Sequence, residues 1–575
     1  MAGGSLNLTA TGSANIILTG NPTKTFFKVV YSKYTNFGLQ KFRLDYEGSR
    51  DLRLTTSSVF QFKVKRYADL LMDTYVVITL PDIWSPIYQP CDQTTYKWAP
   101  YDFRWIRDLG THMIENITIT CGALLLQSYS GAYLEAMLQR DFSEEKKQAF
   151  YKMSGNIPEL NDPGNVYGRV NSYPSAYYMG EGVNIEPSIR GRTIYVPINT
   201  WFTMDSRCAF PLVALQYNEL VINVTIRPIQ ELFQVRDVFD DGNGFPYMQP
   251  DFTKPQFAAY RYLQQPPGVY IDNAAYENTV TTWNADVHLL ATYCFLSEEE
   301  RKKMALEDQV YLVKDVFEYN FENIYGSKTV TLTSNGLISS WMWYLQRNDV
   351  NLRNEWSNYS NWPYRKLPDD VQLAPFEAFQ NKDGSVVVVP GPNIDNTTGN
   401  HILYETGPAT HPPAQGNIAG LNTGYYITGP LSGNNPEHIL VSMGITLNGA
   451  YRENVLPSEI FDLVEQYGRS NGSGRRGLYC YNFGLNTSPF EYQPSGAMNL
   501  ARFKDIDLEL TTITPVTSVD NARFRVICDV TTGDPIGISK QNWRLFDYTF
   551  NMTVFEERYN VLSFVGGNCG LLYSR

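Results

Sequence analysis

Acidic side chains at alternate positions are the first candidates for chemistry in this sequence. Asp505, Asp507 and Glu509 are separated by single apolar residues, so on a β-strand their carboxyl groups would lie on one face. Two carboxylates on one surface can hydrolyse a glycosidic bond, one as acid and the other as base or nucleophile. A solvated strand face produces the same pattern without catalysis, and we favour that interpretation.

Motifs for other reactions are missing or incomplete. Gly326-Ser327-Lys328-Thr329 ends like a phosphate-binding loop but lacks the glycine five residues earlier, so we predict the entry to a strand. No CxxC pair and no GxSxG nucleophile elbow occurs. The histidines are not spaced as in an HExxH zinc motif: His112, His288, His401, His411 and His438. We therefore predict no catalytic residue, no metal site and no cofactor.

Two tryptophans and several glycosylation sequons could each have a function, or could be explained by packing or by chance. Trp341 and Trp343 lie two residues apart on an expected strand and could stack against a sugar, but packing in a core or a subunit interface is favoured. Sequons such as Asn116, Asn223, Asn396 and Asn551 are interpreted as chance in a cytosolic chain, with the loop position Asn396 the first to examine for a glycan.

The charge balance argues against a nucleic-acid-binding protein. Lys and Arg number 47 against 59 Asp and Glu, a net charge of −12, whereas nucleic-acid binding depends on neutralising phosphates. The small basic group of Lys63, Lys65 and Arg66 fits a solvated strand face. We expect no direct contact with nucleic acid.

Cysteine usage and the lack of long apolar runs indicate the compartment. The cysteines are odd in number and widely spaced, which argues against a disulfide framework and suits reducing surroundings: Cys91, Cys121, Cys208, Cys294, Cys480, Cys528 and Cys569. No charged stretch followed by an apolar run opens the sequence, and no apolar run is long enough to span a membrane. We expect a soluble protein made in the cytosol.

The elements that must position these residues are mainly strands. Apolar and polar residues alternate most clearly between Phe546 and Val554, and a period of two predicts a strand with one face on a core. The same alternation recurs in 117–121, 222–226, 506–510 and 524–530. An aromatic content of 14%, with 42 Gly and 32 Pro, favours strands joined by turns and loops. The expected class is all-β, a sandwich or barrel.

Two helical stretches interrupt the strands. Tyr133 to Leu138 has helical spacing, and Ser143 opens a second helix just after it. Ser297 and Glu300 have the spacing of a capping box before a short charged helix. Helices are therefore expected in the connections between strands.

The turn-rich stretches divide the chain into parts. Residues 1–25 are small and polar, and are expected to form an N-terminal arm that orders on contact with neighbours. Residues 26–228 are the first β domain, and 229–280, where turn residues accumulate, are the connection. Residues 281–575 are the second β domain. A long loop insertion at about 354–436 carries one clear strand, Val386–Val389.

Five segments, in order along nearly the whole chain, resemble those of the major capsid proteins of nucleocytoplasmic large DNA viruses. They are LTGNPTKTFFKVVYSKYTNFGLQ (18–40), FPLVALQYNELVINVTIR (210–227), QRNDVNLRNEWSNYSNWPY (346–364), PSGAMNLARF (494–503) and YNVLSFVGGNCGLLYS (559–574). The sequence departs from the family at Asn218, where many relatives carry His, and in the long 354–436 loops.

The resemblance implies two eight-stranded antiparallel jelly rolls in tandem, with short helices in the connecting loops. It also implies a structural subunit that forms homotrimeric, pseudo-hexagonal capsomers, which tile an icosahedral virus shell. The partners implied are neighbouring copies, minor capsid proteins and a nearby internal membrane. The chain would reside in the virion capsid after synthesis and assembly in the host cytoplasm.

Two other functions are kept as alternatives. A minor vertex or scaffold protein of the same virus class would share the fold but not the high copy number. A carbohydrate-binding or carbohydrate-cleaving β-sandwich would use the aromatic and acidic pairs described above. The lack of a secretory signal and the cysteine pattern argue against the second alternative.

Overall fold

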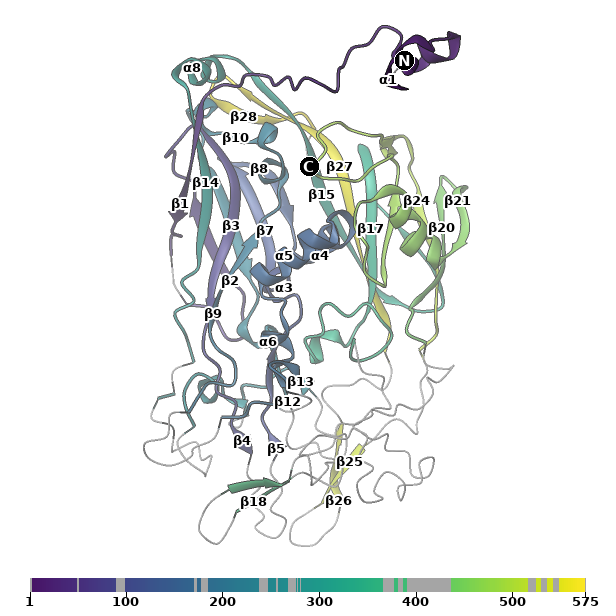
Figure 1. Ribbon diagram of the computed structural model, residues 1–575. Coiled ribbons are helices and arrows are strands. Elements are labelled where there is room, and N and C mark those ends of the chain that lie inside the picture. Colours follow the sequence, from purple (N-terminus) through teal and green to yellow (C-terminus); the bar gives the residue numbers. More distant parts are fainter. Residues whose placement is uncertain are drawn as a thin grey trace.

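The computed structural model describes residues 3–48, 51–88, 99–169, 173–176, 185–236, 247–254, 257–266, 276, 278–279, 281–365, 377–380, 386–389, 436–515, 524–528, 535–540 and 548–573. Two β units lie side by side, and an N-terminal arm leads away from one end (Figure 1). Every strand pairing in these parts of the chain is antiparallel.

The first unit contains two main sheets around one apolar core. One sheet has the order β1-β14-β3-β10, with β9 also paired to β3: β1 (Phe37–Leu44), β14 (His288–Leu296), β3 (Leu70–Leu80), β10 (Phe210–Pro211) and β9 (Arg192–Pro197). The other has the order β2-β11-β7-β8: β2 (Ser58–Lys63), β11 (Leu220–Ile226), β7 (Ile114–Cys121) and β8 (Leu124–Tyr129). A small third sheet is β13-β12-β6: β13 (Tyr247–Met248), β12 (Phe233–Arg236) and β6 (Phe103–Trp105).

The second unit repeats this plan. One sheet has the order β15-β27-β17-β22, with two short strands added: β15 (Gln309–Ile324), β27 (Phe550–Val565), β17 (Leu337–Arg347), β22 (Leu478–Asn482), β23 (Met498–Asn499) and β28 (Asn568–Leu571). The other has the order β16-β24-β20-β21: β16 (Ser327–Thr331), β24 (Ile506–Thr512), β20 (Leu440–Leu447) and β21 (Ala450–Pro457). Three hairpins are separate: β4 (Ile87–Tyr88) with β5 (Ala99–Pro100), β18 (Glu377–Gln380) with β19 (Val386–Val389), and β25 (Phe524–Cys528) with β26 (Pro535–Lys540).

The alternation predicted from the sequence places residues as expected. On β11, Ile222, Val224 and Ile226 are fully buried, while Asn223 and Thr225 are partly exposed. β24 and the first residues of β27 have the same pattern. The strand predicted at 386–389 is also present. The start of the predicted strand at Phe546 lies outside the described residues.

The sheet β15-β27-β17-β22, which we call the shared sheet, lies between the two units, and its strand β17 is buried on both faces. On β17, Trp341 and Trp343 pack in the core of the second unit. Met342 and Tyr344, which alternate with them and point to the opposite face, pack against the first unit. Because both faces need apolar side chains, alternation disappears from this strand. The apolar contact between the units is therefore continuous with the core of the first.

Helices fill the connections. Most of them lie in the first unit: α3 (Leu109–Met113), α4 (Gly131–Asp141), α5 (Glu144–Ser154), α6 (Pro158–Asn161) and α7 (Trp201–Met204). The second unit has a π-helical turn at Ile460–Val464 and α10 (Glu465–Arg469). The predicted start at Ser143 is confirmed, since Ser143 is the N-cap of α5. In the parts of the chain that the structure describes, no helix has the length and apolar character of a membrane span.

The helix α8 (Glu298–Leu306) begins after Ser297 as predicted, but the capping box is not formed. Ser297 has the extended backbone of an N-cap, yet its side chain accepts no capping hydrogen bond. The spacing of Ser297 and Glu300 thus located the helix correctly without predicting its contacts.

The division of the chain predicted at residue 280 needs correction. It would assign β14 to the second unit, but β14 is hydrogen-bonded to β1 and β3 of the first. Within the predicted connection, β12 pairs with β6, and Phe233 and Val235 are buried in the first core. Sequence spacing could not reveal these long-range pairings. We therefore propose that the units divide at α8, between Leu296 and Gln309.

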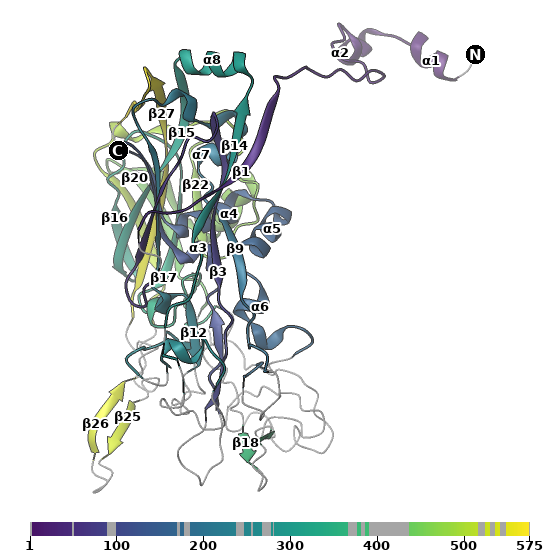
Figure 2. The same ribbon diagram turned by 90° about the vertical axis from the view of Figure 1, so that its left-hand side faces the viewer.

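The N-terminal arm is longer than the predicted residues 1–25. It contains two short helices, α1 (Gly3–Thr9) and α2 (Ile16–Thr19), and every residue from 3 to 36 is exposed. It leaves the body where β1 begins and extends well beyond it (Figure 2). The segment 26–36, expected in the first domain, therefore belongs structurally to the arm.

Candidate functional site

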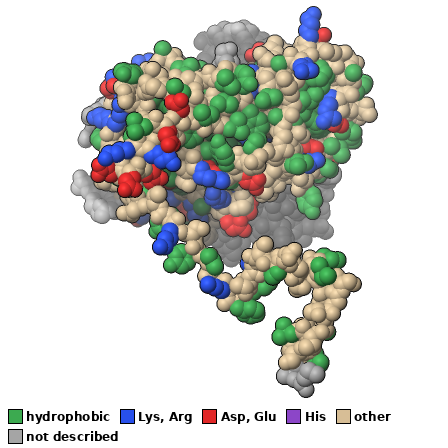
Figure 3. Space-filling model, turned by 90° about the horizontal axis from the view of Figure 1, so that it is seen from above, with side chains coloured by type: hydrophobic (Ala, Val, Ile, Leu, Met, Phe, Trp, Pro, Cys, Tyr) green, Lys and Arg blue, Asp and Glu red, His purple; other side chains and the backbone are tan. Residues whose placement is uncertain are grey.

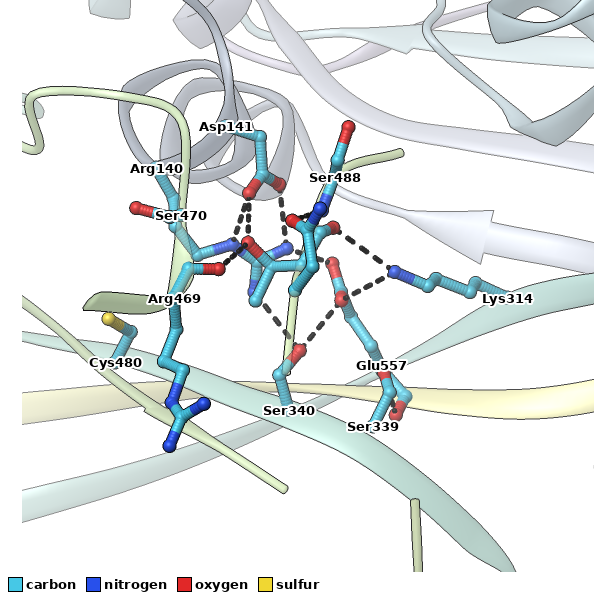
Figure 4. Close-up of polar contacts among 12 residues, drawn as sticks. Arg140, Asp141, Lys314, Ser339, Ser340, Arg469, Ser470, Cys480, Ser488 and Glu557 are labelled. Carbon is cyan, nitrogen blue, oxygen red and sulfur yellow. Dashed lines mark hydrogen bonds and ion pairs between the residues drawn. The ribbon is translucent and has the colours of Figure 1, made fainter. Parts of the chain in front are cut away.

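The two units are joined by charged side chains buried between α4 and the shared sheet (Figure 4). Arg140, at the end of α4, binds the adjacent Asp141 through Nε (3.0 Å) and Nη2 (2.7 Å). Across the interface, Nη2 donates to Oε1 of Glu557 on β27 (2.8 Å) and Nη1 donates to Oγ of Ser340 on β17 (3.1 Å). The side chains of Arg140 and Asp141 are 0% exposed. This guanidinium therefore links helix and sheet out of contact with water.

Glu557 is the acceptor at the centre of this network. The hydroxyls of Tyr133 (2.9 Å) and Ser340 (2.7 Å) donate to its two oxygens, and Lys314 Nζ lies 3.8 Å from Oε2. Burial acts to raise the pKa of Glu557, but attraction to Arg140 and Lys314, with the hydrogen bonds, outweighs it and lowers that pKa to about 2. The carboxylate is therefore ionised at neutral pH and balances the buried cation.

A second network joins α3 and α4 to the loop before β22. Arg475 Nη2 lies 2.8 Å from Asp108 Oδ2 and 2.9 Å from Glu135 Oε1. The same loop bonds to the helix end through its backbone, because the Gly472 N–H donates to the Arg140 carbonyl (2.8 Å). A Cβ at Gly472 would collide with that carbonyl oxygen, so a residue without a side chain is needed at this position.

The segment 346–364, noted only as a resemblance, contains a third network. Asp349 lies between Arg347 Nη2 and Arg353 Nη2, each 2.8 Å from one of its oxygens. Burial acts to raise the pKa of Asp349, but the two guanidinium groups outweigh it and hold that pKa well below its usual range. These three side chains fix the path of the chain after β17.

The same segment reaches back to the first unit. Asn354 Nδ2 donates to the carbonyl of Gln230 (2.7 Å), and Trp356 Nε1 donates to that of Glu231 (3.0 Å). Both acceptors precede β12, in the stretch predicted as a loose connection. The 346–364 segment therefore fixes the two units against each other, a role that the sequence alone did not indicate.

A polar cavity of about 250 Å³ lies beside the second network, lined by residues that include Gln139, Tyr151, Tyr359, Arg365, His438 and Arg475. Its charged residues are paired, as Arg475 is with Asp108 and Glu135, and Arg476 with Glu437 at 2.6 Å. Across the described residues, no group of three or more His, Cys, Asp or Glu side chains is placed to hold a metal ion. A contact between the units accounts for the charge of Arg475, and a pair within the second unit accounts for that of Arg476.

The two tryptophans and the three carboxylates considered for carbohydrate chemistry do not form one site. Trp341 and Trp343 are 1% and 0% exposed, which confirms the core interpretation. Asp505, Asp507 and Glu509 lie along the outer side of β24, where Thr331 donates to Asp507 (2.6 Å) and Tyr451 to Glu509 (2.7 Å). The solvated-face interpretation is therefore confirmed.

Other sequence predictions are resolved in the same way. Lys328 lies on β16, as the strand interpretation required, and its Nζ donates to the carbonyls of Glu322 and Asn323. Lys63, Lys65 and Arg66 are exposed, as expected of a solvated strand face. The sequon at Asn396 lies outside the described residues, as do Cys91 and two of the histidines.

His112 gives the fold a predictable acid sensitivity. It lies in α3, is 3% exposed, and its Nε2 has no hydrogen-bond partner among the described residues. Burial, together with Arg227 and Arg475 and against the attraction of Asp108, lowers the pKa of His112 to about 3. The unfolded chain, with an ordinary pKa near 6.5, therefore binds a proton that the folded chain does not.

We expect stability to fall as the pH drops below about 6.5, by up to about 1.4 kcal/mol per pH unit from this residue. From pH 7 to pH 5 the loss attributable to His112 would be about 2 kcal/mol. Urea unfolding at both pH values measures it. His112→Gln, which cannot take up the proton, should lose less stability over this range than the wild type. Equal losses would show that His112 does not titrate as described.

Two groups of exposed apolar side chains mark surfaces for other molecules. The first is on the end that carries α8 and the β27–β28 hairpin (Figure 3), and we call it the end surface: Tyr217 (73%), Leu306 (85%), Val310 (61%), Val565 (51%) and Leu572 (63%). The second is on the flank of the second unit, at β21 and the helical turns after it, and we call it the flank surface: Tyr451, Val455, Leu463, Val464 and Tyr467. Grouped exposed apolar residues of this kind indicate binding surfaces.

Comparison with known proteins gives two consecutive family matches. Residues 25–289 match the model described as "Major capsid protein N-terminus". Residues 300–570 match the model described as "Large eukaryotic DNA virus major capsid protein". The gap between the matches contains most of β14 and the first residues of α8, close to the division of the units proposed above.

Individual relatives agree over their full lengths. The major capsid protein of Phaeocystis pouchetii virus is 26% identical, with all of both chains covered. That of Paramecium bursaria Chlorella virus 1 is 23% identical, again with all of both chains covered. Among solved structures, the PBCV-1 capsid model covers 96% of this chain and 100% of its own (TM-score 0.55, 18% identity). The Faustovirus major capsid protein covers 96% and 94% (TM-score 0.55, 12% identity).

The structural matches, with the two pairs of packed sheets, define a double jelly-roll protein and confirm the predicted fold class. Its buried charges join the two rolls. The chain belongs to the family of major capsid proteins of large eukaryotic DNA viruses. It is a structural subunit of a viral capsid, not an enzyme.

Proposed function

We propose that three copies of this chain form a ring-shaped capsomer with a pseudo-hexagonal outline, and that capsomers tile an icosahedral shell. The observation that carries the proposal is the fixed pairing of two similar β units through the shared sheet. Three chains of two units each would place six similar units around a threefold axis. A ring of this kind joins two different surfaces head to tail and closes at three.

The flank surface is our candidate for one side of the ring contact. Tyr467 is 93% exposed, and Leu463 (61%) and Val464 (56%) lie beside it on the preceding helical turn. Obligate interfaces bury about 2,000–5,000 Å² and are more apolar than transient ones. Contacts between capsomers should be smaller and more polar, so that errors of the lattice can be reversed.

Light scattering after size exclusion tests the trimer. We expect a mass close to three times the 65.5 kDa of the chain. Charges placed on the flank surface by Leu463→Asp with Val464→Asp should shift the mass towards one chain, because unpaired carboxylates would be buried in the contact. Leu306→Asp, on the end surface, is the matched control and should leave the trimer intact. A wild-type mass of one chain would contradict the proposal.

The N-terminal arm is proposed to lie beneath the capsomer and to order against neighbouring copies or minor capsid proteins. Its apolar residues have no cover within the chain: Leu8 is 81% exposed, Leu18 89% and Phe27 98%. The arm leaves from the same end of the body as the end surface (Figures 1 and 2). Both features therefore suit the side of the shell that meets other components.

Deletion of residues 1–19 should impair particle assembly while leaving trimers intact, since residues 3–19 are all exposed. Electron micrographs of assembled particles and light scattering of the trimer would measure the two effects separately. Normal particles from the truncated chain would contradict the role proposed for the arm.

We also propose the surroundings of the protein. The net charge of −12 supports a shell that does not touch nucleic acid directly. The apolar end surface would face minor capsid proteins and the region of an internal membrane. Assembly is expected in the host cytoplasm, where the dispersed cysteines would remain reduced.

A further inference from the structure

Three segments that are distant in sequence meet beside the turn between β27 and β28. The Gly567 carbonyl accepts the backbone N–H of Gln216 (3.0 Å). Asn218 Nδ2 donates to Oδ1 of Asn568 (3.4 Å). The end of β7 meets the same loop, because a Cβ built on Gly122 would lie 2.8 Å from Oδ1 of Asn218. Asn218 thus lies between the end of β7 and the C-terminal hairpin.

Each of these two ends carries a cysteine next to its contact with Asn218. Cys121 precedes Gly122 as the last residue of β7, and Cys569 follows Asn568 on β28. The two thiols lie close enough for each to shift the pKa of the other. Cys121 is 1% exposed, whereas Cys569 is only partly buried. One thiol is therefore accessible from solvent and the other lies directly behind it.

The electrostatic surroundings suit the chemistry of this pair. The contact with Cys569 lowers the pKa of Cys121 against the effect of burial, and the nearby Arg66 lowers it further. The same contact, together with burial, raises the pKa of Cys569 well above its usual value, so Cys121 is the thiol that ionises first. Arg66 is held in place by its Nη2, which donates to the Asn218 carbonyl (3.0 Å). Thiolate, not thiol, is the species that attacks a disulfide.

The other cysteines with described surroundings differ. Burial raises the pKa of Cys208 to about 11 and that of Cys480 to about 12. Burial also raises the pKa of Cys294, on β14. For none of these three does a contact to a second thiol occur among the described residues.

We propose that Cys121 and Cys569 form a reversible intramolecular disulfide that ties the C-terminal hairpin of the second unit to β7 of the first. A small disulfide such as oxidised glutathione is the oxidant. The accessible thiol of Cys569 attacks it, forms a mixed disulfide and gives up its proton to the glutathione thiolate that leaves. Cys121 then attacks the sulfur of Cys569 and releases the second glutathione. Two protein thiols are oxidised, one glutathione disulfide is reduced, and both thiol protons end on glutathione.

The bond would close most of the chain into a single loop, and long loops give the largest stabilisation on cross-linking. In reducing surroundings the pair stays open. It closes when the protein meets an oxidising medium, as it would outside a cell if the proposed function holds. The bond would then make the association of the two rolls harder to reverse.

The test uses the purified full chain, equilibrated with glutathione at graded ratios of oxidised to reduced form and then alkylated. On a non-reducing denaturing gel the oxidised chain should migrate faster, because the large loop keeps it compact. Peptide mass spectrometry should find Cys121 linked to Cys569. The Tm should rise by about 2–5 °C over that of the reduced chain.

Cys569→Ser, at the partly exposed position, should fold normally and lose the faster band and the rise in Tm. Cys294→Ser is the matched control and should keep both. Separate alkylation of Cys121 and Cys569 at every ratio would overturn the proposal, and so would a link to any other cysteine. The assay needs no assembly, so its failure would leave the trimer measurement unaffected.

Discussion

Phe550→Asp is expected to abolish the recovery of folded protein. Phe550 opens β27, is 0% exposed and lies in the core of the second unit, where its ring meets that of Tyr548 at 5.9 Å. The substitution removes a large apolar side chain, at about 3–5 kcal/mol, and buries an unpaired carboxylate at a cost of several more. The sum is comparable to the whole folding free energy of a domain, about 5–15 kcal/mol.

Asn551→Asp is the control for this substitution. It places the same charge one residue further along β27, on the side where the strand is partly exposed. Expression with circular dichroism and thermal unfolding compares the two variants. We expect normal yield for Asn551→Asp and aggregated chain for Phe550→Asp. Folded Phe550→Asp protein at normal yield would show that this face of β27 is not core.

Arg140→Ala is expected to destabilise the chain by about 3–5 kcal/mol, because it leaves Asp141 and Glu557 buried without the guanidinium they share, with Lys314 3.8 Å from Glu557 as the remaining cation. The loss should appear in urea unfolding at neutral pH. Arg190→Ala is the control, since Arg190 and Glu186 form an ion pair that is 76% and 77% exposed, and such pairs contribute about 0–1 kcal/mol.

A double variant separates the lost charge balance from lost packing. Adding Glu557→Gln to Arg140→Ala removes one of the two buried carboxylates that have lost Arg140 as a partner. The double variant should therefore be more stable than the sum of the single changes predicts, because the two side chains are in contact. Strict additivity would indicate that Arg140 and Glu557 do not interact.

The acid sensitivity contributed by Glu557 should run in the same direction as that of His112. The pKa of Glu557 is lowered to about 2, so the stability it contributes is complete above its ordinary pKa near 4.5 and lost as the pH falls towards 2.

Local patterns in the sequence predicted much of the fold. Alternation located β11, β24 and β27 because one face of each strand packs in a core and the other is more exposed. A strand was expected at Trp341 and Trp343, but the pattern did not show that both faces of β17 are buried, one in each unit. Nor could it place β14, since its partners lie more than two hundred residues away along the chain.

The contacts between the units were the least predictable feature. Arg140 and Glu557 lie in segments with no shared motif, and only the docking of α4 on the shared sheet brings them together. The 346–364 segment was noted as a family resemblance, yet its role depends on Asn354 and Trp356 meeting carbonyl groups of the first unit. The thiol pair was missed for the same reason. The wide spacing of the cysteines argued against disulfides. That argument missed the pair, because separation in sequence does not determine distance in the fold.

Electron microscopy of the purified, negatively stained protein tests the central claim most directly. If paired β units are built to close into rings of three, class averages should show six lobes around a threefold axis. Isolated two-lobed particles at every concentration would contradict the claim, since the exposed apolar residues of the flank surface would then have no partner in a ring.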